Sequence, residues 1–400
     1  MFAARTPQPG VPIPSDLAVR RLALARMVSM AGSASASVAL AAVLYARTGS
    51  AAWVAAALFI SFATPAVASP LTGTLGDRLD RRCVLICSDL LGAACFAAMS
   101  LLHTPAALLA LAFPAALAAS PFLPASAAMV PALAEPARLP WANARMAIAR
   151  NAGALVGPAL GGGTVTLLGG SAAFALNAGS FLASAWLIGT LHGEFRARPA
   201  PRGEPHARMT EGLRMLLREP ALRALAVGFL LVDAGNGLAI PAEVALAHVF
   251  GTGSVGYGAL VALWGAGGLL GGPLAARVLE RHTPFAVLEV AAAGLAVAFV
   301  LTAVAPWFAV ALGALSVGGA TMSVAGVAED LLFQRRVSDH LRSRVYAARI
   351  AVIQVSLAAP LLFSGFLVNA AGPRVVYAAA GGLAACGTVA LATMMRRAGR

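Results

Sequence analysis

Long apolar runs recur along the 400-residue chain and leave few positions for polar side chains. The runs lie near 24–46, 51–71, 84–102, 105–131, 144–168, 171–191, 222–247, 255–276, 284–305, 307–328, 345–370 and 375–394. A helix that crosses a bilayer needs about 20 mostly apolar residues, and these runs have that length. They are continuous, whereas the strands of a membrane barrel alternate apolar and polar residues. The sequence therefore predicts an all-α membrane protein with twelve transmembrane helices.

The charged residues exclude several other classes of protein. Only 11% of the residues are charged, too few for a soluble chain that is 60% apolar to cover its surface. All 29 basic residues are arginine, so a P-loop and Schiff-base chemistry are excluded because both need lysine. The four cysteines and six histidines form no metal-binding motif. We expect no enzyme, no cofactor, no metal site and no nucleic-acid partner.

The arginines predict how the chain is oriented in the membrane. Twenty-seven of the 29 lie in the two terminal segments and in the connections, with their flanks, after every second run. Basic loops stay on the cytoplasmic side, so both termini and the 192–220 segment are expected in the cytoplasm. This alternation is consistent only with an even number of spans.

The chain also contains a repeat, which predicts two halves of six helices each. Residues 73–82 read GTLGDRLDRR, and residues 272–281 read GPLAARVLER at the corresponding place of the second half. The predicted division is an N-terminal bundle at 1–191, a cytoplasmic linker at 192–220 and a C-terminal bundle at 221–400. In the linker, Leu213, Leu216 and Leu217 share one helical face, which is typical of a short amphipathic helix on an anionic membrane surface.

The motif at residues 73–82 resembles the major facilitator superfamily of secondary transporters. Its Gly73, Asp77, Arg78, Arg81 and Arg82 have the spacing of that family's loop between helices 2 and 3. Asp80 departs from the commonest form, which has glycine there, and resembles the macrolide and siderophore exporters. The resemblance implies two pseudo-symmetric six-helix bundles, with Asp77 and Arg78 as a latch between helices at the cytoplasmic face. The alternative is that these arginines only set the topology.

A second motif lies in the fifth run and resembles the antiporter motif of exporters in the same superfamily. It consists of Gly153, Gly157, Pro158, Gly161 and Gly162. Small residues at intervals of four let another helix approach closely, and proline bends the helix. Close packing alone also accounts for this pattern, so the direction of transport rests on the resemblance.

Several acidic residues fall near the ends of apolar runs and are expected to pair with neighbouring arginines. Asp89 follows Arg81 and Arg82, and Glu289 follows Arg281 in the second copy, which also contains Arg277. Glu329 and Asp330 precede Arg335 and Arg336 and are interpreted as another part of the latch. Buried carboxylates are costly in a membrane, so paired ones are expected to be structural.

Asp233 differs from these acids because it lies near the middle of the seventh run. Asn236 follows one turn later, and Glu243 is placed near the outer end of the same helix. A carboxylate at this depth is a candidate for taking and releasing a proton during transport, with Asn236 orienting it and Glu243 receiving protons from outside. The structural alternative is a hydrogen bond from Asp233 to a facing serine or backbone group.

Together these patterns indicate a monomeric, proton-driven exporter in a bacterial-type inner membrane. Its partners would be protons, the lipid bilayer and a lipophilic, drug-like or siderophore-like small molecule, and the proton gradient would be its energy source. Two alternatives stay open. One is proton-coupled uptake by symport, and the other is a receptor or assembly protein on the same fold that transports nothing.

Overall fold

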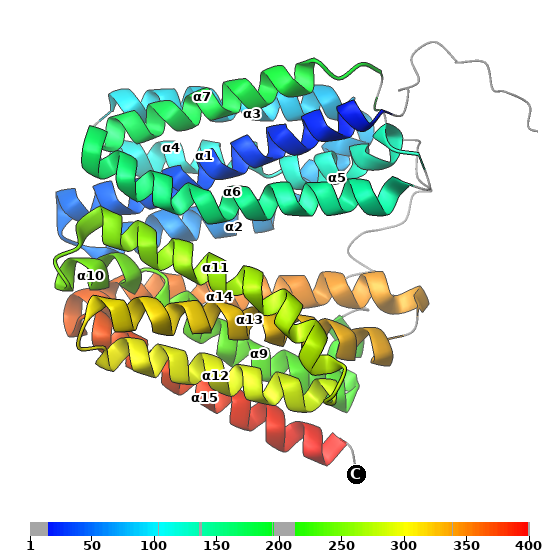
Figure 1. Cartoon of the computed structure of the whole chain (residues 1–400), viewed down its shortest axis with the longest axis vertical. Helices are drawn as coiled ribbons and strands as arrows, with labels where there is room; N and C mark the ends of the chain where they lie inside the picture. Colours follow the sequence, from blue (N-terminus) through cyan, green and yellow to red (C-terminus); the bar gives the residue numbers. More distant parts are fainter. Residues whose placement is uncertain are drawn as a thin grey trace, which may run out of the picture. The chain divides into compact units, whose positions relative to one another are not determined.

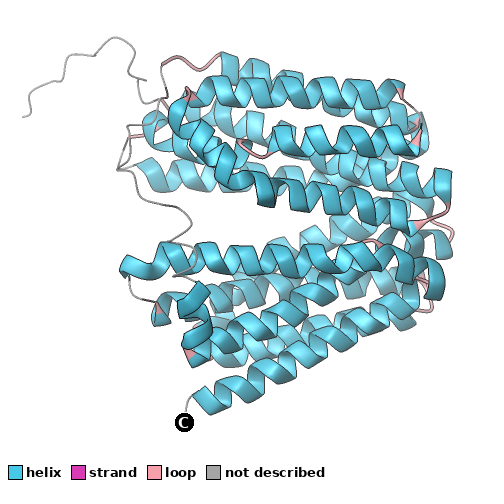
Figure 2. Cartoon of the chain, turned by 180° about the vertical axis from the view of Figure 1, so that it is seen from behind, coloured by secondary structure: helices cyan, strands magenta, loops and turns pink. Residues whose placement is uncertain are grey.

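The computed structural model describes residues 15–102, 104–135, 138–193, 195, 213–337 and 339–398. Within these ranges the chain is helical, with no strand, and its loops join the helix ends (Figure 2). The helices are α1 (Asp16–Thr48), α2 (Ala51–Arg78), α3 (Arg81–Leu101), α4 (Pro105–Ala119), α5 (Phe122–Leu133), α6 (Leu139–Leu168), α7 (Gly170–Gly189), α9 (Pro220–Ala239), α10 (Ala242–Val249), α11 (Gly253–Leu279), α12 (Pro284–Val304), α13 (Phe308–Arg336), α14 (Asp339–Ala371) and α15 (Pro373–Ala398). The predicted all-α class is confirmed.

Nine of the helices in the described ranges are long and apolar enough to cross a bilayer, and Ala51–Pro65 and Pro105–Ala119 are shorter apolar helices. The number of twelve spans stays a prediction. Each predicted run corresponds to one helix, except two runs that are divided. The run at 105–131 breaks between α4 and α5 at Pro121, and the run at 222–247 breaks between α9 and α10 at Pro241. Proline has no backbone N–H, so a helix restarts readily after it.

The contacts divide the chain into two compact units. Unit 1 comprises Met1–Ala36, Thr64–Gly157 and Leu168–Pro201, and unit 2 comprises Ser37–Ala63, Pro158–Leu167 and Arg202–Arg400. In Figure 1 the helices of each unit lie side by side along a shared direction. Many large apolar side chains point away from the packed interior, including Leu167, Trp186, Leu270, Val290 and Phe366. An apolar exterior of this kind matches hydrocarbon chains of lipid rather than water.

In unit 1, α3 packs against α7, α4 and α5. A cluster of buried side chains from α1, α3, α5 and α7 includes Leu22, Leu85, Phe122 and Ile188. Because these residues come from distant parts of the sequence, the cluster joins the helices of this unit at one end of α3.

Asp80 organises the start of α3. Its Oδ1 accepts hydrogen bonds from the backbone N–H groups of Arg82 (2.8 Å) and Cys83 (3.4 Å). Its Oδ2 accepts a bond of 2.9 Å from the backbone N–H of Phe195, which follows α7. The first N–H groups of a helix have no partner within the helix, so this carboxylate caps α3 and attaches the 195 region to it.

Replacing Asp80 with alanine should destabilise unit 1. Loss of a helix cap costs about 0.5–2 kcal/mol, and the Phe195 N–H would lose its acceptor as well. Thermal unfolding of the purified protein in detergent should show a lower midpoint for Asp80→Ala. Asp80→Asn keeps one acceptor oxygen for the cap but turns an NH2 donor towards the second N–H, so its midpoint should lie between those of the wild type and Asp80→Ala. Equal midpoints for all three proteins would contradict the capping role.

In unit 2, α13 lies between α11 and α12, α15 lies between α12 and α9, and α9 also packs on α14. The contact of α11 with α13 is made by backbone atoms. A Cβ added at Gly267 would lie 1.9 Å from the carbonyl oxygen of Ser316, and one added at Gly319 would lie 2.0 Å from that of Trp264. Only glycine allows this approach, as expected for helices in a membrane that associate through small residues. We call this contact the α11–α13 seam.

Candidate functional site

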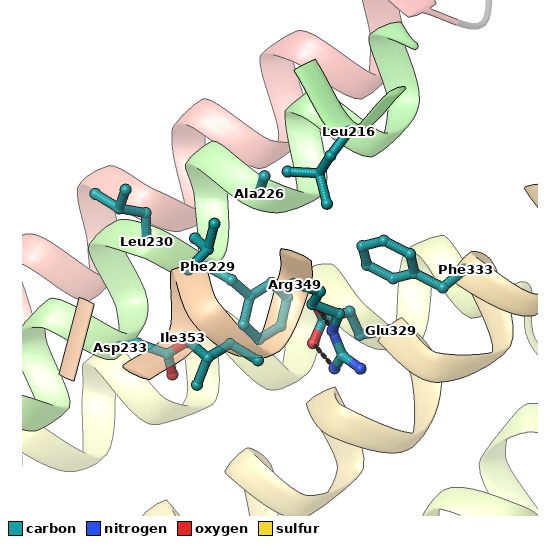
Figure 3. A pocket seen from close by; sticks show the side chains of 10 residues that line it. Leu216, Ala226, Phe229, Leu230, Asp233, Glu329, Phe333, Arg349 and Ile353 are labelled. Atoms are coloured by element: carbon teal, nitrogen blue, oxygen red, sulfur yellow. Dashed lines mark hydrogen bonds and ion pairs between the residues drawn. The ribbon is translucent and has the colours of Figure 1, made fainter. Parts of the chain in front are cut away.

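A small pocket in unit 2 contains two of the predicted acidic residues, Asp233 and Glu329. It is narrow, with a cavity volume of about 10 Å³ for the centres of water-sized molecules. The residues that line it come from the 213–218 segment, α9, α13 and α14, and Figure 3 shows most of them as labelled sticks. They are Leu216, Ala226, Phe229, Leu230, Asp233, Glu329, Phe333, Arg349, Val352 and Ile353. Three charged side chains therefore face an otherwise apolar pocket.

Arg349 of α14 binds the acidic end of α13. Its Nε donates to Glu329 Oε1 at 2.9 Å, and its Nη2 donates to Glu329 Oε2 at 2.6 Å. Its Nη1 donates to Asp330 Oδ1 at 2.5 Å, and its guanidinium carbon lies 5.1 Å from the centre of the Phe333 ring. Two parallel N–H bonds to one carboxylate are the strong, directional form of an arginine–acid pair.

This pairing corrects the predicted one. Glu329 and Asp330 were expected to meet Arg335 and Arg336, but the structure brings Arg349 of α14 to both of them. Arg336 instead lies 3.4 Å from Glu219, the residue that caps α9. The side chain of Arg335 lies outside the described part of the structure.

Asp233 lies on the buried face of α9, and its side chain enters the same pocket (Figure 3). Only 2% of its surface is exposed. Glu329 and Arg349 both lie within electrostatic range of it. Within the described ranges, Asp233 has no hydrogen-bonding or ion-pair partner, so the serine or backbone bond considered as the structural alternative is not made.

The other two residues predicted to act with Asp233 lie outside the pocket. Asn236 is half-buried on α9, where its backbone oxygen accepts from Ile240, and it does not line the pocket. Glu243 was placed on the same helix as Asp233, but it lies on α10 beyond the turn at Pro241. It is buried within electrostatic range of Tyr257 and Tyr377, which belong to α11 and α15.

The predicted latch is described only in part. Gly73, Asp77 and Arg78 lie at the end of α2, and their side chains are outside the described part of the structure. Arg82 donates from Nη2 to the backbone oxygen of Gly189 at the end of α7. In the second copy, Arg277 and Arg281 are exposed near the end of α11.

Two further predicted ion pairs are corrected by the structure. Asp89 is fully buried, and its polar neighbours are Ser184 of α7 and Arg26 of α1 rather than Arg81 and Arg82. No hydrogen bond of normal geometry reaches its carboxylate oxygens from the described residues.

Glu289 likewise does not pair with Arg281. It accepts a bond of 3.2 Å from Arg396, which lies at the end of α15. Glu289 and Glu329 therefore pair across helices, and Asp89 lies in the range of Arg26 on another helix.

The antiporter-like motif lies on α6 and forms close backbone contacts, as its small residues predict. Within unit 1, a Cβ at Gly153 would lie 2.7 Å from the Met27 carbonyl oxygen, and one at Gly157 would lie 2.6 Å from that of Ala31. Within unit 2, a Cβ at Gly162 would lie 2.5 Å from the Ser254 carbonyl oxygen of α11.

The other two residues of the motif complete this surface. Gly161 is buried, and the carbonyl oxygen of Pro158 lies 2.6 Å from the position a Cβ would take at Gly258. The motif therefore allows close approach of α6 to α1 and to α11, each through its own part of the helix.

Sequence reasoning missed Arg349 and Arg26 as members of these sites. Arg349 lies inside the predicted run at 345–370, yet it was grouped with the loop arginines that precede that run. An arginine within an apolar run requires a buried partner, and that signal was available in the sequence. The pairing itself depends on how α13 and α14 pack, which the sequence alone does not specify.

The comparisons with known proteins agree with the fold. The family model described as Major Facilitator Superfamily matches residues 22–235. The multidrug efflux pump Tap of Mycobacterium bovis strain BCG is 30% identical over 338 residues, which cover 78% of each chain. Tap of Mycolicibacterium fortuitum is 30% identical over 332 residues, covering 78% of this chain and 80% of the relative.

Solved structures show the same architecture at low sequence identity. The nucleoside transporter NupG superposes with a TM-score of 0.73 at 13% identity, covering 95% of this chain and 99% of its own. A POT family transporter in complex with a thioalcohol-conjugated peptide gives a TM-score of 0.75 at 10% identity, covering 96% of each chain. Family model, curated relatives and fold agree, and the chain belongs to the Major Facilitator Superfamily of membrane transporters.

Proposed function

We propose that the protein exports lipophilic small molecules from the cell in exchange for protons, by alternating access. The observation that carries this proposal is the pocket in which two buried carboxylates face one guanidinium and apolar walls. Such walls suit a lipophilic solute, and a carboxylate without a hydrogen-bonding partner can exchange a proton for a cationic group. Relatives named as multidrug efflux pumps, at 30% identity, favour export over uptake.

Within this proposal, Asp233 is the proton-coupling residue. Its place in the pocket supports this role. Asn236 and Glu243 do not line the pocket, so they would act from outside it. Glu243 lies beside two tyrosines at the α10 turn and would belong to the path by which protons reach the bundle from outside. The glycine motif on α6 supports the antiporter assignment through the resemblance described above.

A flux experiment separates the proposed function from its alternatives. The purified protein would be reconstituted into liposomes with an acidic lumen, and ethidium would be added outside as a fluorescent lipophilic cation. Proton-coupled exchange should drive ethidium into the lumen, and a protonophore should abolish the accumulation. Accumulation only in vesicles with an alkaline lumen would establish symport, and an unchanged passive leak would favour the receptor or assembly alternative.

We further propose that the protein lies in a bacterial inner membrane with both termini and the 192–220 linker in the cytoplasm. The distribution of the arginines supports this orientation, because 27 of the 29 would otherwise face outward. A phosphatase reporter that is active only outside the cytoplasm should be inactive when it is fused after Arg202. An active reporter at that position would reverse the orientation.

The carboxylate of Asp77 is proposed to act as part of a cytoplasmic latch that stabilises one of the alternating states. Asp77→Asn should insert and bind substrate normally but turn over several-fold more slowly, because the balance of states shifts while the binding site stays intact. Ethidium exchange in liposomes measures the rate.

Asp16→Asn provides the matched control. It removes a carboxylate from a solvent-exposed pair with Arg138 (2.8 Å) in the same unit and should exchange ethidium at the wild-type rate. A wild-type rate for Asp77→Asn would eliminate the latch.

A further inference from the structure

The charges around the unit 2 pocket do not balance. Glu329 and Asp233 are 3% and 2% exposed, and the side chain of Arg349 is 13% exposed. Asp330 has a side chain that is 47% exposed, so water solvates its charge. As far as the structure describes its side chains, the buried part of the cluster therefore holds two carboxyl groups and one guanidinium. A surplus buried charge is strongly unfavourable, so one of the two carboxyl groups must hold a proton or face a cation.

The hydrogen bonds are divided unequally between the two buried carboxyl groups. Glu329 uses both of its oxygens to accept from Arg349, and the Phe333 ring beside the guanidinium restricts how that group can turn. Asp233 interacts with the same guanidinium only through space. Ionised carboxylates are stabilised by bonds of this kind, and a carboxylate without them is the more easily protonated of a pair.

From this asymmetry we infer that Arg349 is a positioning residue that keeps Glu329 ionised and so makes Asp233 the carboxyl group that carries the exchangeable proton. The step is a simple protonation: a proton binds to Asp233 Oδ from the side of higher proton concentration and leaves the same oxygen on the other side, while Glu329 and Arg349 keep their charges. The inference rests on the proposed proton coupling for its meaning in transport, but it assigns a protonation site that can be tested without transport.

Among the described side chains, the other elements packed on α9 bring no further charge to this cluster. α10 and α15 contribute Glu243 and Tyr377, which act on one another and on Tyr257. On α9 itself, Arg223 is exposed at the first turn, and Glu219 caps the helix and pairs with Arg336. At the end of α15, Arg396 pairs with Glu289. Of the described charges, Glu329 and Arg349 therefore act on the protonation of Asp233.

The geometry also explains why arginine is needed at position 349. Three of its N–H groups are used at once, two on Glu329 and one on Asp330. A lysine could supply the charge but not a planar fork for both oxygens of Glu329. Arg349→Lys should therefore retain the charge balance of the pocket while holding Glu329 less firmly.

Infrared difference spectroscopy of the purified protein tests the assignment directly, because a protonated carboxyl group has its own C=O stretching band. On titration across the range of pH in which the protein stays folded, the wild type should lose one such band that Asp233→Asn lacks. Arg349→Gln should show a second titrating band from Glu329, because that carboxylate has lost its partner. Glu329→Gln should show no band of protonated Asp233 anywhere in this range of pH. Arg349 is then left with Asp233 as its counter-charge, so Asp233 stays ionised.

Arg336→Gln is the matched control, since it removes an arginine from an exposed pair on the same helix as Glu329 and should titrate like the wild type. If Arg349→Gln does not fold, Arg349→Lys and Glu329→Gln decide the question: Arg349→Lys should keep the single band. A titrating band that survives in Asp233→Asn, or an unchanged band in Glu329→Gln, would overturn the assignment. The expected spectra combined with no proton-driven ethidium flux would disprove the proposed function and leave the protonation site intact.

Discussion

Asp233→Asn should reduce proton-driven ethidium accumulation in liposomes to the level of liposomes without protein. The amide has nearly the shape of the carboxyl group but binds no proton in this range, so the variant cannot exchange a proton for substrate. Because Asp233 has no hydrogen-bonding or ion-pair partner within the described ranges, its replacement breaks no bond that holds the bundle together. Binding of ethidium and its exchange without a gradient should therefore persist, so that coupling alone is lost.

Asp233→Glu provides the matched control for this prediction. It retains a carboxyl group in the pocket and should recover part of the proton-driven accumulation. Accumulation by Asp233→Asn at the wild-type rate, with the same dependence on pH, would exclude Asp233 as the coupling residue. Attention would then move to Glu329 in the same pocket and to Glu243 at the α10 turn.

Gly157→Ala is expected to have the largest effect on stability among single methyl additions to α6. The new Cβ would lie 2.6 Å from the Ala31 carbonyl oxygen and 2.6 Å from the Ala34 Cβ, both of them on α1. Neither atom belongs to a flexible side chain, so the two helices must move apart. Overpacking of this kind costs about 1–3 kcal/mol, and the thermal midpoint of the detergent-purified protein should fall accordingly.

The same helix offers a control that differs only in its surroundings. A Cβ at Gly163 would meet no atom within 4 Å, so Gly163→Ala should leave the midpoint unchanged or raise it slightly. Equal midpoints for the two variants would mean that α6 and α1 tolerate a wider spacing than the structure shows. The glycine motif would then need an explanation other than close packing.

The helices could be predicted from the sequence because continuous apolar length is enough to identify them. The breaks at Pro121 and Pro241 could not be, since Pro114, Pro158 and Pro360 lie inside helices that continue past them. A proline interrupts a membrane helix only where neighbouring helices do not restore the freed backbone groups. That condition depends on packing between helices, which local sequence does not contain.

For the charged residues, too, the sequence predicts positions better than it predicts partners. Asp233 could be identified because a carboxylate in the middle of an apolar run has few structural explanations. The partners of Asp89, Glu289 and Glu329 were assigned to the nearest arginines in sequence, and the structure places different arginines beside them. Ion pairs between helices are set by packing, so proximity along the chain is a poor guide to them.

The α11–α13 seam has a mechanical consequence for the C-terminal helices. The backbones of these two helices touch at Gly267 and Gly319, and a displacement by one turn, about 5.4 Å, would bring Leu315 or Ser323, which have a Cβ, to the place of Gly319. Sliding of one helix along the other is therefore blocked, and we expect α11 and α13 to move together as one rigid body. Because Glu329 lies on α13, any movement of α11 is transmitted to the carboxylate that Arg349 holds.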